Sequence, residues 1–340
     1  MRRQVCVIEG DGIGREVIPP AVEVLCAVLD GVEVVSAEAG WECFQRRGGS
    51  VPPQTLEAVR ACGAALFGAV SSPARKVEGY RSAILTLRQE LDLYANLRPV
   101  RGVFAQPPAA QVDMIIVREN SEGLYAGRER REGDTAIAER VITLAASRRI
   151  GRRAVEMLTR RGAGRLTIVH KANILPLTDG LFRQGVMEAV EEARRGGQAV
   201  EVEEMLVDNA AYQLAVDAGR FAVLVTTNLF GDILSDVAAR WCGGMGLAPS
   251  LNLGDDCAVA EPVHGSAPDI AGRGIANPAA AMLSAALLAR YVWKEEDAAR
   301  RIELAVQLAL QTPGENTTAA ITRRVLAALE TNAMTGGMQV

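Results

Sequence analysis

The stretch FAVLVTTNLFGDILSD (residues 221–236) predicts a strand followed directly by a helix. Its first part is apolar and suits a buried parallel strand, so the helix would begin at the carboxyl edge of a sheet, where α/β proteins bind ligands. Asp232 and Asp236 are four residues apart, which places both carboxylates on one helix face. Like charges at this spacing repel. The pair therefore either faces solvent or binds a cation, and these residues alone leave both interpretations open.

The composition indicates a globular protein. The chain has 340 residues, of which 49% are hydrophobic and 4% aromatic, so an aliphatic core is expected. A formal net charge of -4 argues against a nucleic-acid partner. The absence of a long apolar run predicts no membrane contact and a cytoplasmic location. The six cysteines form no CxxC pair and there are two histidines, so neither structural zinc nor a disulfide framework is expected.

Strand and helix patterns alternate from the first residues, which predicts α/β architecture with helices covering parallel strands. The first block comprises strands at 4–8, 32–36 and 64–70 and helices at 16–29 and 54–62. A turn-forming run at 102–111 marks a candidate boundary. The second block has strands at 113–118, 166–170 and 200–207, helices at 145–161 and 179–194, and an irregular charged stretch at 128–134. Residues 243–256 are interpreted as loop, and helices at 278–293, 297–311 and 317–332 are expected to close the first domain.

The run GDGIG (residues 10–14) lies between a predicted strand and a predicted helix, as a dinucleotide-binding turn would. Its spacing is G-x-G-x-G, whereas the Rossmann fingerprint requires G-x-G-x-x-G. The carboxylate of Asp11 would also repel a pyrophosphate at a helix N-terminus. A simple turn and a loop beside some other ligand both remain open.

Several charged or acidic side chains fall where predicted strands end. Arg88, Arg98 and Arg118 could hold substrate carboxylates with bidentate geometry, or could be surface charges. Tyr125 and Lys171 are candidates for proton transfer, because a partly desolvated lysine can act near neutral pH. The glycine-rich run 261–278 lets backbone approach a ligand, with Asp269 as an acceptor for ribose hydroxyls, or else is a linker.

These motifs, in this order, resemble the β-decarboxylating dehydrogenases, which include isopropylmalate, isocitrate, homoisocitrate and tartrate dehydrogenases. The resemblance spans nearly the whole chain and rests on EGDGIG (9–14), LYANLRP (93–99), RENSEGLY (118–125), HKAN (170–173), TTNLFGDILSD (226–236) and the run 261–278. It implies an isopropylmalate dehydrogenase-like α/β fold: two α/β domains with parallel and mixed sheets, and no standard Rossmann site. Residues 1–99 and 246–340 would form the large, cofactor-side domain. Residues 100–245 would form a small domain with the dimer interface and a clasp-like arm at about 126–145.

The resemblance also implies the site residues. Mg²⁺ or Mn²⁺ would be bound by Asp232, Asp236 and an Asp208 from the neighbouring subunit, which would also supply Lys171. Tyr125 and Lys171 are the implied catalytic groups. The implied substrate-binding residues are Ser72, Arg88, Arg98, Arg118, Tyr125, Lys171 and Asn173. The implied cofactor-binding residues are Val70, Ser71, Ser72, Asn173, Glu261, His264, Gly265, Ser266, Ala267, Pro268, Asp269, Ile270 and Asn277. The pair Asp269–Ile270 favours NAD, since an aspartate would repel the 2′-phosphate of NADP.

The segment 71–88 looks most like that of homoisocitrate dehydrogenases, with Ser72 available for a distal carboxylate and Arg81 and Leu85 as possible specificity residues. The implied function is NAD-dependent oxidative decarboxylation of homoisocitrate to 2-oxoadipate and CO₂, a reaction of lysine biosynthesis. Isocitrate and 3-isopropylmalate remain alternative substrates. A non-catalytic regulatory subunit of a hetero-oligomer is a second alternative. The expected partners are a small 2-hydroxy-3-carboxy acid and further copies of the chain, as a homodimer or dimer of dimers with shared active sites.

Overall fold

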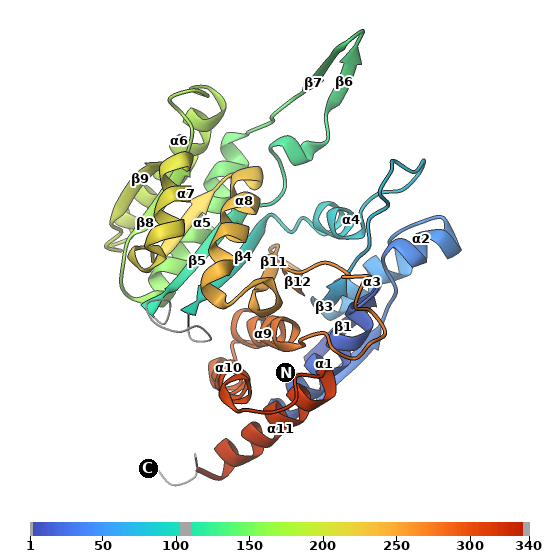
Figure 1. Ribbon diagram of the computed structural model, residues 1–340. Helices are drawn as coiled ribbons and strands as arrows, with labels where there is room; N and C mark the ends of the chain where they lie inside the picture. Colours follow the sequence, from blue (N-terminus) through green and yellow to red (C-terminus); the bar gives the residue numbers. More distant parts are fainter. Residues whose placement is uncertain (1–2, 103–110, 336–340) are drawn as a thin grey trace. The chain divides into compact units, whose positions relative to one another are not determined.

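The computed structural model describes residues 3–102 and 111–335 (Figure 1). The chain divides into two units: unit 1 consists of Met1–Asp92 and Gly244–Val340, and unit 2 of Leu93–Gly243. The boundaries expected from the sequence, and the role expected for each domain, stay predictions. Most of the turn-forming run at 102–111 lies outside the described residues.

Unit 1 contains a mixed sheet with strand order β2-β1-β3-β12-β11. Its strands are β1 (Arg3–Gly10), β2 (Val32–Ser36), β3 (Ala64–Ala69), β11 (Pro249–Leu253) and β12 (Ala258–Pro262). β1 pairs in parallel with β2 and β3, β12 pairs in parallel with β3, and β11 is antiparallel to β12. The carboxyl ends of β1, β2, β3 and β12 therefore lie at one edge of this sheet, which is where α/β proteins bind ligands.

The helices of unit 1 complete an aliphatic core. They are α1 (Gly14–Val28), α2 (Trp41–Arg47), α3 (Pro53–Cys62), α4 (Ala83–Glu90), α9 (Ala279–Leu287), α10 (Glu296–Gln311) and α11 (Thr318–Thr335), with a π-helical turn at Leu288–Val292. Every residue of α9 is buried, because this helix contacts α1, α10 and the strands β11 and β12. A helix that is apolar on all sides is stable only when its neighbours cover it in this way.

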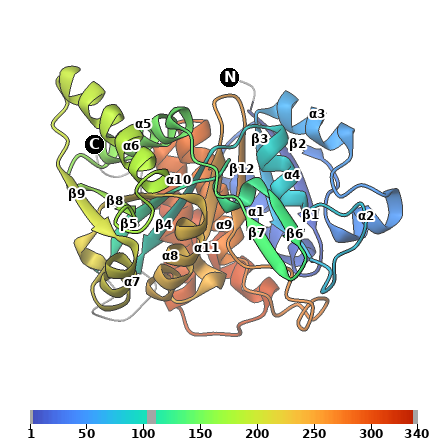
Figure 2. The same ribbon diagram turned by 90° about the horizontal axis from the view of Figure 1, so that it is seen from above.

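Within unit 2 the strand order is β4-β5-β10-β8-β9. The strands are β4 (Ala95–Arg101), β5 (Asp113–Glu119), β8 (Leu166–His170), β9 (Val202–Leu206) and β10 (Val223–Thr226). β5, β10, β8 and β9 are parallel and β4 is antiparallel to β5. The helices are α5 (Leu144–Arg161), α6 (Thr178–Arg195), α7 (Val207–Val216) and α8 (Asn228–Ala239). α5 packs against α6 and α7 against α8, and the two pairs cover opposite faces of the sheet (Figure 2).

Three local predictions from the sequence were wrong. Residues 249–253 form β11 and not loop, because its polar side chains are satisfied inside the hairpin: Ser250 donates to the carbonyl of Glu261 and Asn252 to that of Val259, both at 3.1 Å. The charged stretch at 128–134 is not irregular, since β6 (Glu129–Glu132) pairs with β7 (Thr135–Ala138) in an exposed hairpin (Figure 1). The strand expected to reach residue 207 ends at Leu206, where α7 begins.

Within residues 3–102 and 111–335, none of the helices combines the length and the apolar character that crossing a bilayer requires.

Candidate functional site

Four parallel strands of unit 2 deliver chemically active side chains to one edge of the sheet. Arg118 lies near the end of β5, Lys171 directly follows β8, and Asp208 lies in the first turn of α7, which follows β9. α8 begins two residues after β10 and contributes Asp232 and Asp236. The edge position follows from parallel pairing, because parallel strands end on the same side.

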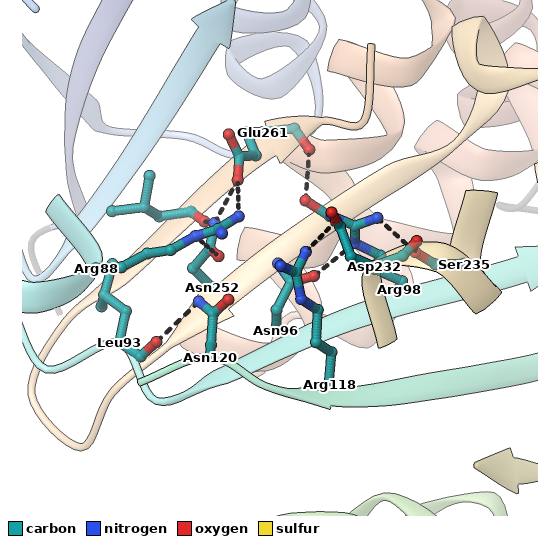
Figure 3. A network of polar contacts seen from close by, with 12 residues as sticks. Arg88, Leu93, Asn96, Arg98, Arg118, Asn120, Asp232, Ser235, Asn252 and Glu261 are labelled. Carbon is teal, nitrogen blue, oxygen red and sulfur yellow. Dashed lines mark hydrogen bonds and ion pairs between the residues drawn. The ribbon is translucent and has the colours of Figure 1, made fainter. Parts of the chain in front are cut away.

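Asp232 is the centre of a polar cluster (Figure 3). Its Oδ2 accepts a hydrogen bond of 2.7 Å from the hydroxyl of Tyr125, which lies in a 3-10 turn at Leu124–Ala126. Its Oδ1 lies 2.5 Å from Nη1 of Arg118 and 3.4 Å from Nη2 of Arg98. The structure thus brings together two of the three predicted arginines, the predicted proton donor and one predicted metal ligand.

Arg118 is the most constrained member of this cluster, with a side chain that is 1% exposed. Oδ1 of Asn228 accepts hydrogen bonds from its Nε at 3.2 Å and from its Nη2 at 2.7 Å. Gly231 makes room for it, since a Cβ at that position would lie 2.6 Å from Cγ of Arg118. The glycine of the NLFGD motif is therefore needed for close packing against the guanidinium stem.

Asp236 lies one helical turn after Asp232, as the spacing predicted. Its Oδ1 is 3.5 Å from Nη1 of Arg98, and its side chain is 57% exposed. Burial raises the pKa of Asp236, and the positive charge of Arg98 partly offsets this increase. A positive charge on the solvent-exposed side of Asp236 would further stabilise its carboxylate form. A hard divalent cation supplies such a charge. This donor set is all oxygen and fits such an ion.

Burial also raises the pKa of Tyr125, and the hydrogen bond to Asp232 acts in the same direction because it stabilises the neutral phenol as donor. Arg118 opposes the shift, with its guanidinium 5.1 Å from the ring centroid. The tyrosine therefore keeps its proton at neutral pH, as a general acid must.

Lys171 and Asp208 form an ion pair, in which Nζ of Lys171 contacts Oδ1 of Asp208. The Asp208 side chain is 64% exposed, and the hydrogen bond from Lys171 lowers the pKa of Asp208. Among the described residues, no three His, Cys, Asp or Glu side chains gather as a metal site would require. One chain therefore does not bring Asp208 to Asp232 and Asp236. Asn173, on the loop after Lys171, is exposed.

In unit 1, Arg88 is the centre of a second polar cluster (Figure 3). Its Nε donates to Oδ1 of Asn252 at 3.0 Å, and its Nη2 lies 3.1 Å from Oε1 of Glu261. Asn252 also donates to the same Glu261 oxygen at 2.8 Å. Glu261, which the resemblance places in the cofactor site, thus orients Arg88 in this structure.

The GDGIG loop functions as a structural junction. A Cβ on Gly12 would lie 2.2 Å from the carbonyl oxygen of Ser266, and the amide of Ile13 donates to that same oxygen at 3.0 Å. Gly12 has φ +56, which a glycine adopts without strain. The loop therefore supports the run 264–277 by close backbone contact, which explains its glycine spacing without a pyrophosphate.

Two acidic residues, whose structural role the sequence did not predict, hold these loops. Asp11 is 1% exposed, and its carboxylate accepts hydrogen bonds from the amides of Trp41, Glu42 and Ser71 at 2.7, 3.0 and 2.9 Å. Glu16, in the first turn of α1, accepts from the amides of Gly272 and Gly274 at 2.6 and 2.8 Å. For Asp11, its position between two glycines was the available sequence signal. For Glu16 no local signal exists, because its partners are more than 250 residues away.

Apart from Glu261, which lies in β12, the predicted cofactor residues of unit 1 lie on two loops at the carboxyl edge of its sheet. Val70, Ser71 and Ser72 follow β3, and Ser71 Oγ donates to Ser266 Oγ at 2.9 Å. Burial lowers the pKa of His264, so its imidazole is neutral near pH 7. The second loop also contains Gly265, Ala267, Pro268, Asp269, Ile270 and Asn277. Asp269 is exposed, and Asn277 Oδ1 accepts from the amide of Ala279 at the start of α9, at 3.0 Å.

An aromatic cluster anchors the segment predicted to set specificity. The ring of Tyr80 lies edge-on to Trp41 and Phe44 of α2, with centroids 5.1 and 5.2 Å apart, and its hydroxyl donates to the carbonyl of Ser71 at 3.1 Å. Arg81 is exposed and donates to Gln89, while Leu85 is partly buried.

Comparisons with known proteins agree with this arrangement. The model of a family described as isocitrate/isopropylmalate dehydrogenase matches residues 4–337. This chain belongs to that family. It is 53% identical to the isocitrate/homoisocitrate dehydrogenase of Thermus thermophilus, over 97% of this chain and 99% of that protein. It is 48% identical to the homoisocitrate dehydrogenase of Methanocaldococcus jannaschii, over 86% of each.

The fold comparison gives the same family. The structure of a β-decarboxylating dehydrogenase from Thermococcus kodakarensis matches with a TM-score of 0.86 at 41% identity, covering 99% of each chain. The predictions of the β-decarboxylating dehydrogenase family and of its α/β fold are thereby confirmed. As an isocitrate/isopropylmalate dehydrogenase family member, the chain is an oxidoreductase of the β-decarboxylating class.

Proposed function

We propose that this protein is an NAD-dependent homoisocitrate dehydrogenase that requires Mg²⁺ or Mn²⁺. The observation that carries the proposal is the Asp232 cluster, where Tyr125, Arg98 and Arg118 all contact one carboxylate that is one helical turn from Asp236. Such a concentration of acid–base and carboxylate-binding groups at a strand edge suits a 2-hydroxy-3-carboxy acid. The homoisocitrate relatives support the choice of substrate.

Asp232 and Asp236 would hold the metal ion together with Asp208 of the partner subunit. When bound, the cation supplies positive charge for the substrate's hydroxyl and carboxylate oxygens, and the nicotinamide supplies the hydride acceptor. Arg88, Arg98 and Arg118 orient the carboxylate that departs as CO₂.

Proton transfers are assigned to two residues. Lys171, acting through Asp208, takes the proton of the C2 hydroxyl as hydride leaves C2. Tyr125 gives its proton to C3 after CO₂ has departed, which its raised pKa permits because the phenol is protonated at neutral pH. Lys171 is suited to this role by its place directly after a buried strand, in a chain whose only other lysines are Lys76 and Lys294.

Cofactor choice is proposed from Asp269. Its exposed carboxylate, in the loop that Glu16 holds, can accept hydrogen bonds from ribose hydroxyls and would repel a 2′-phosphate. We therefore expect kcat/KM to be higher with NAD than with NADP. A higher value with NADP would contradict this assignment.

The substrate is tested by steady-state kinetics on homoisocitrate, isocitrate and 3-isopropylmalate, with NAD and Mg²⁺. We expect the highest kcat/KM for homoisocitrate, since Ser72 and Arg81 offer polar groups for its distal carboxylate, whereas an apolar pocket would favour isopropylmalate. The highest value for isopropylmalate would overturn the substrate assignment. No NADH from any of the three would favour the regulatory-subunit alternative.

The metal ligands are tested separately. Asp232→Asn should abolish metal-dependent turnover and leave the fold intact, with Asp217→Asn, an aspartate at the end of α7, as the matched control. Manganese soaked into crystals should give an anomalous peak beside Asp232 and Asp236. Unchanged turnover in Asp232→Asn refutes its role as a ligand.

Shared active sites are proposed because α7 and α8 expose apolar side chains next to the predicted ligands. Tyr212 and Val216 of α7 and Ile233 of α8 are 63%, 53% and 53% exposed, an unusual set for a surface that faces only water. Co-refolding Lys171→Met with Asp232→Asn, each inactive alone, should restore about one quarter of wild-type activity, since half of the dimers have one intact site. No restoration would show that each chain uses its own Lys171.

A further inference from the structure

Asp179 is a fully buried carboxylate to which the proposed function gives no role. It lies in the first turn of α6 and is 0% exposed. Its Oδ2 accepts a hydrogen bond of 2.6 Å from the backbone amide of Lys171, and its Oδ1 pairs with the guanidinium of Arg140. One oxygen therefore fixes the end of β8 that presents Lys171, and the other requires a positive partner.

Arg140 connects that carboxylate to the start of α8. Its Nη2 donates to Oγ1 of Thr227 at 2.9 Å, and its guanidinium lies 4.9 Å from the ring centroid of Phe230. Thr227 directly precedes α8, the helix that contains Asp232 and Asp236. Arg140 thus spans from α6 to the start of α8.

The chain around Arg140 extends this connection. Arg140 follows the β6–β7 hairpin, and the next residue, Val141, exchanges backbone hydrogen bonds of 2.8 and 3.3 Å with Gly123. Gly123 directly precedes the 3-10 turn of Tyr125. The two side chains of one ion pair therefore lie at the junction of the segments that present Lys171, Tyr125 and the α8 aspartates.

A buried carboxylate tolerates little change in its surroundings, because removing its charged partner costs free energy in a medium that solvates polar and charged groups poorly. The planar guanidinium is also essential to the geometry, since its two Nη atoms serve Asp179 and Thr227 at once. A lysine would keep the charge but could not span both acceptors with a fixed angle.

We propose that Arg140 and Asp179 are positioning residues that hold Lys171, which would serve the partner's site, and the start of α8, which would serve this chain's own site, in the positions that the reaction needs. The inference rests on the proposed function, because it assigns these residues to the orientation of groups that the dehydrogenase reaction uses. Neither side chain touches the reacting atoms. They act through the backbone of Lys171 and through Thr227.

The kinetic test uses Arg140→Gln, Asp179→Asn and Arg140→Lys in the full-length protein. We expect kcat to fall roughly 10- to 100-fold in the first two variants, because a misplaced proton-transfer group costs that much. The KM for NAD should stay within about twofold, since all the predicted cofactor residues except Asn173 are in unit 1. Arg140→Lys should recover part of kcat, and it also covers the case in which Arg140→Gln does not fold. Arg130→Gln is the control: this arginine lies on the neighbouring β6 strand, is 50% exposed and pairs with Glu132 and Glu139.

A second readout does not need turnover. Lys76, Lys171 and Lys294 are the only lysines of the chain, so acylation of each amine by a small reagent can be followed by mass spectrometry. We expect Lys171 to react several-fold faster in Arg140→Gln and Asp179→Asn than in the wild type, with Lys76 and Lys294 of unit 1 as unchanged internal references.

The two readouts separate the possible failures. A wild type that oxidises none of the three acids would defeat the proposed function, and the labelling of Lys171 would then decide the positioning role by itself. Wild-type kcat and wild-type Lys171 labelling in both Arg140→Gln and Asp179→Asn would overturn the inference. Equal losses of kcat in Arg140→Gln and in the Arg130→Gln control would overturn it as well.

Discussion

Replacement of Asp11 should destabilise unit 1 by an amount that can be worked out from its contacts. The Asp11 carboxylate accepts three backbone hydrogen bonds, from Trp41, Glu42 and Ser71. Asp11→Ala leaves three amide groups without this acceptor. Each loss costs about 1 kcal/mol, at the low end of the range because the three donors are in partly exposed residues. The expected total is about 3 kcal/mol for Asp11→Ala.

Asp11→Asn shows how much stability is lost when one of the three hydrogen bonds is removed. Its single carbonyl oxygen can replace Oδ2, which accepts from Trp41 and Ser71, so only the bond from Glu42 is lost. We expect a cost of about 1–2 kcal/mol, which includes placing the new amide group against an N–H donor. The matched control is Asp30→Ala, an exposed aspartate at the end of α1, which should change stability by less than about 0.5 kcal/mol.

Urea unfolding followed by circular dichroism measures these differences. For a unit of this size, the stability lost in Asp11→Ala corresponds to a decrease of about 6–12 °C in the midpoint of thermal unfolding. Because the Ser71 amide is released next to Ser72, a predicted substrate-binding residue, the KM of the substrate should also rise several-fold. If Asp11→Ala unfolds within about 0.5 kcal/mol of the wild type, the three hydrogen bonds do not hold this loop and the reasoning is wrong.

Three further predictions concern other parts of the chain. Glu16→Gln should raise the KM for NAD several-fold with kcat unchanged, because one of the amides of Gly272 and Gly274 loses its acceptor; an unchanged KM in cofactor titrations would count against the role of Glu16. Gly231→Ala should cost about 1–3 kcal/mol and lower activity, since its Cβ would strike Arg118, whereas Gly180→Ala in α6, with open space around it, should be neutral or stabilising; equal effects in thermal unfolding would contradict this. Alkylation at pH 8 should modify the exposed Cys26 first and spare Cys6 and Cys242, because burial raises the pKa of Cys6 to about 12 and of Cys242 to about 11, so their reactive thiolate forms only as the pH rises towards those values; peptide mapping that found Cys6 modified as fast as Cys26 would refute this.

The candidate site illustrates what local patterns can and cannot predict. Asp232 and Asp236 were assigned to one helix face from their spacing alone, and the structure agrees because helical geometry depends only on nearby residues. The residues PSLNL favour a loop by composition, because Pro, Ser and Asn are typical of turns. Their polar side chains are satisfied by β12, which local propensity does not register.

The α/β alternation and the helical placement of the paired aspartates follow from the linear sequence, and so does the enzyme family, through a resemblance that spans the chain. These depend on short-range periodicity and on the order of motifs, both of which can be read along one dimension. The roles of Asp11, Glu16 and Asp179, by contrast, depend on the packed fold. Asp11 and Glu16 meet their partners because the fold brings distant segments together, and the partners of Glu16 lie 256 and 258 residues further along the chain. Hydrogen bonds over such separations depend on the packed fold, since no local pattern specifies which distant amide will need an acceptor.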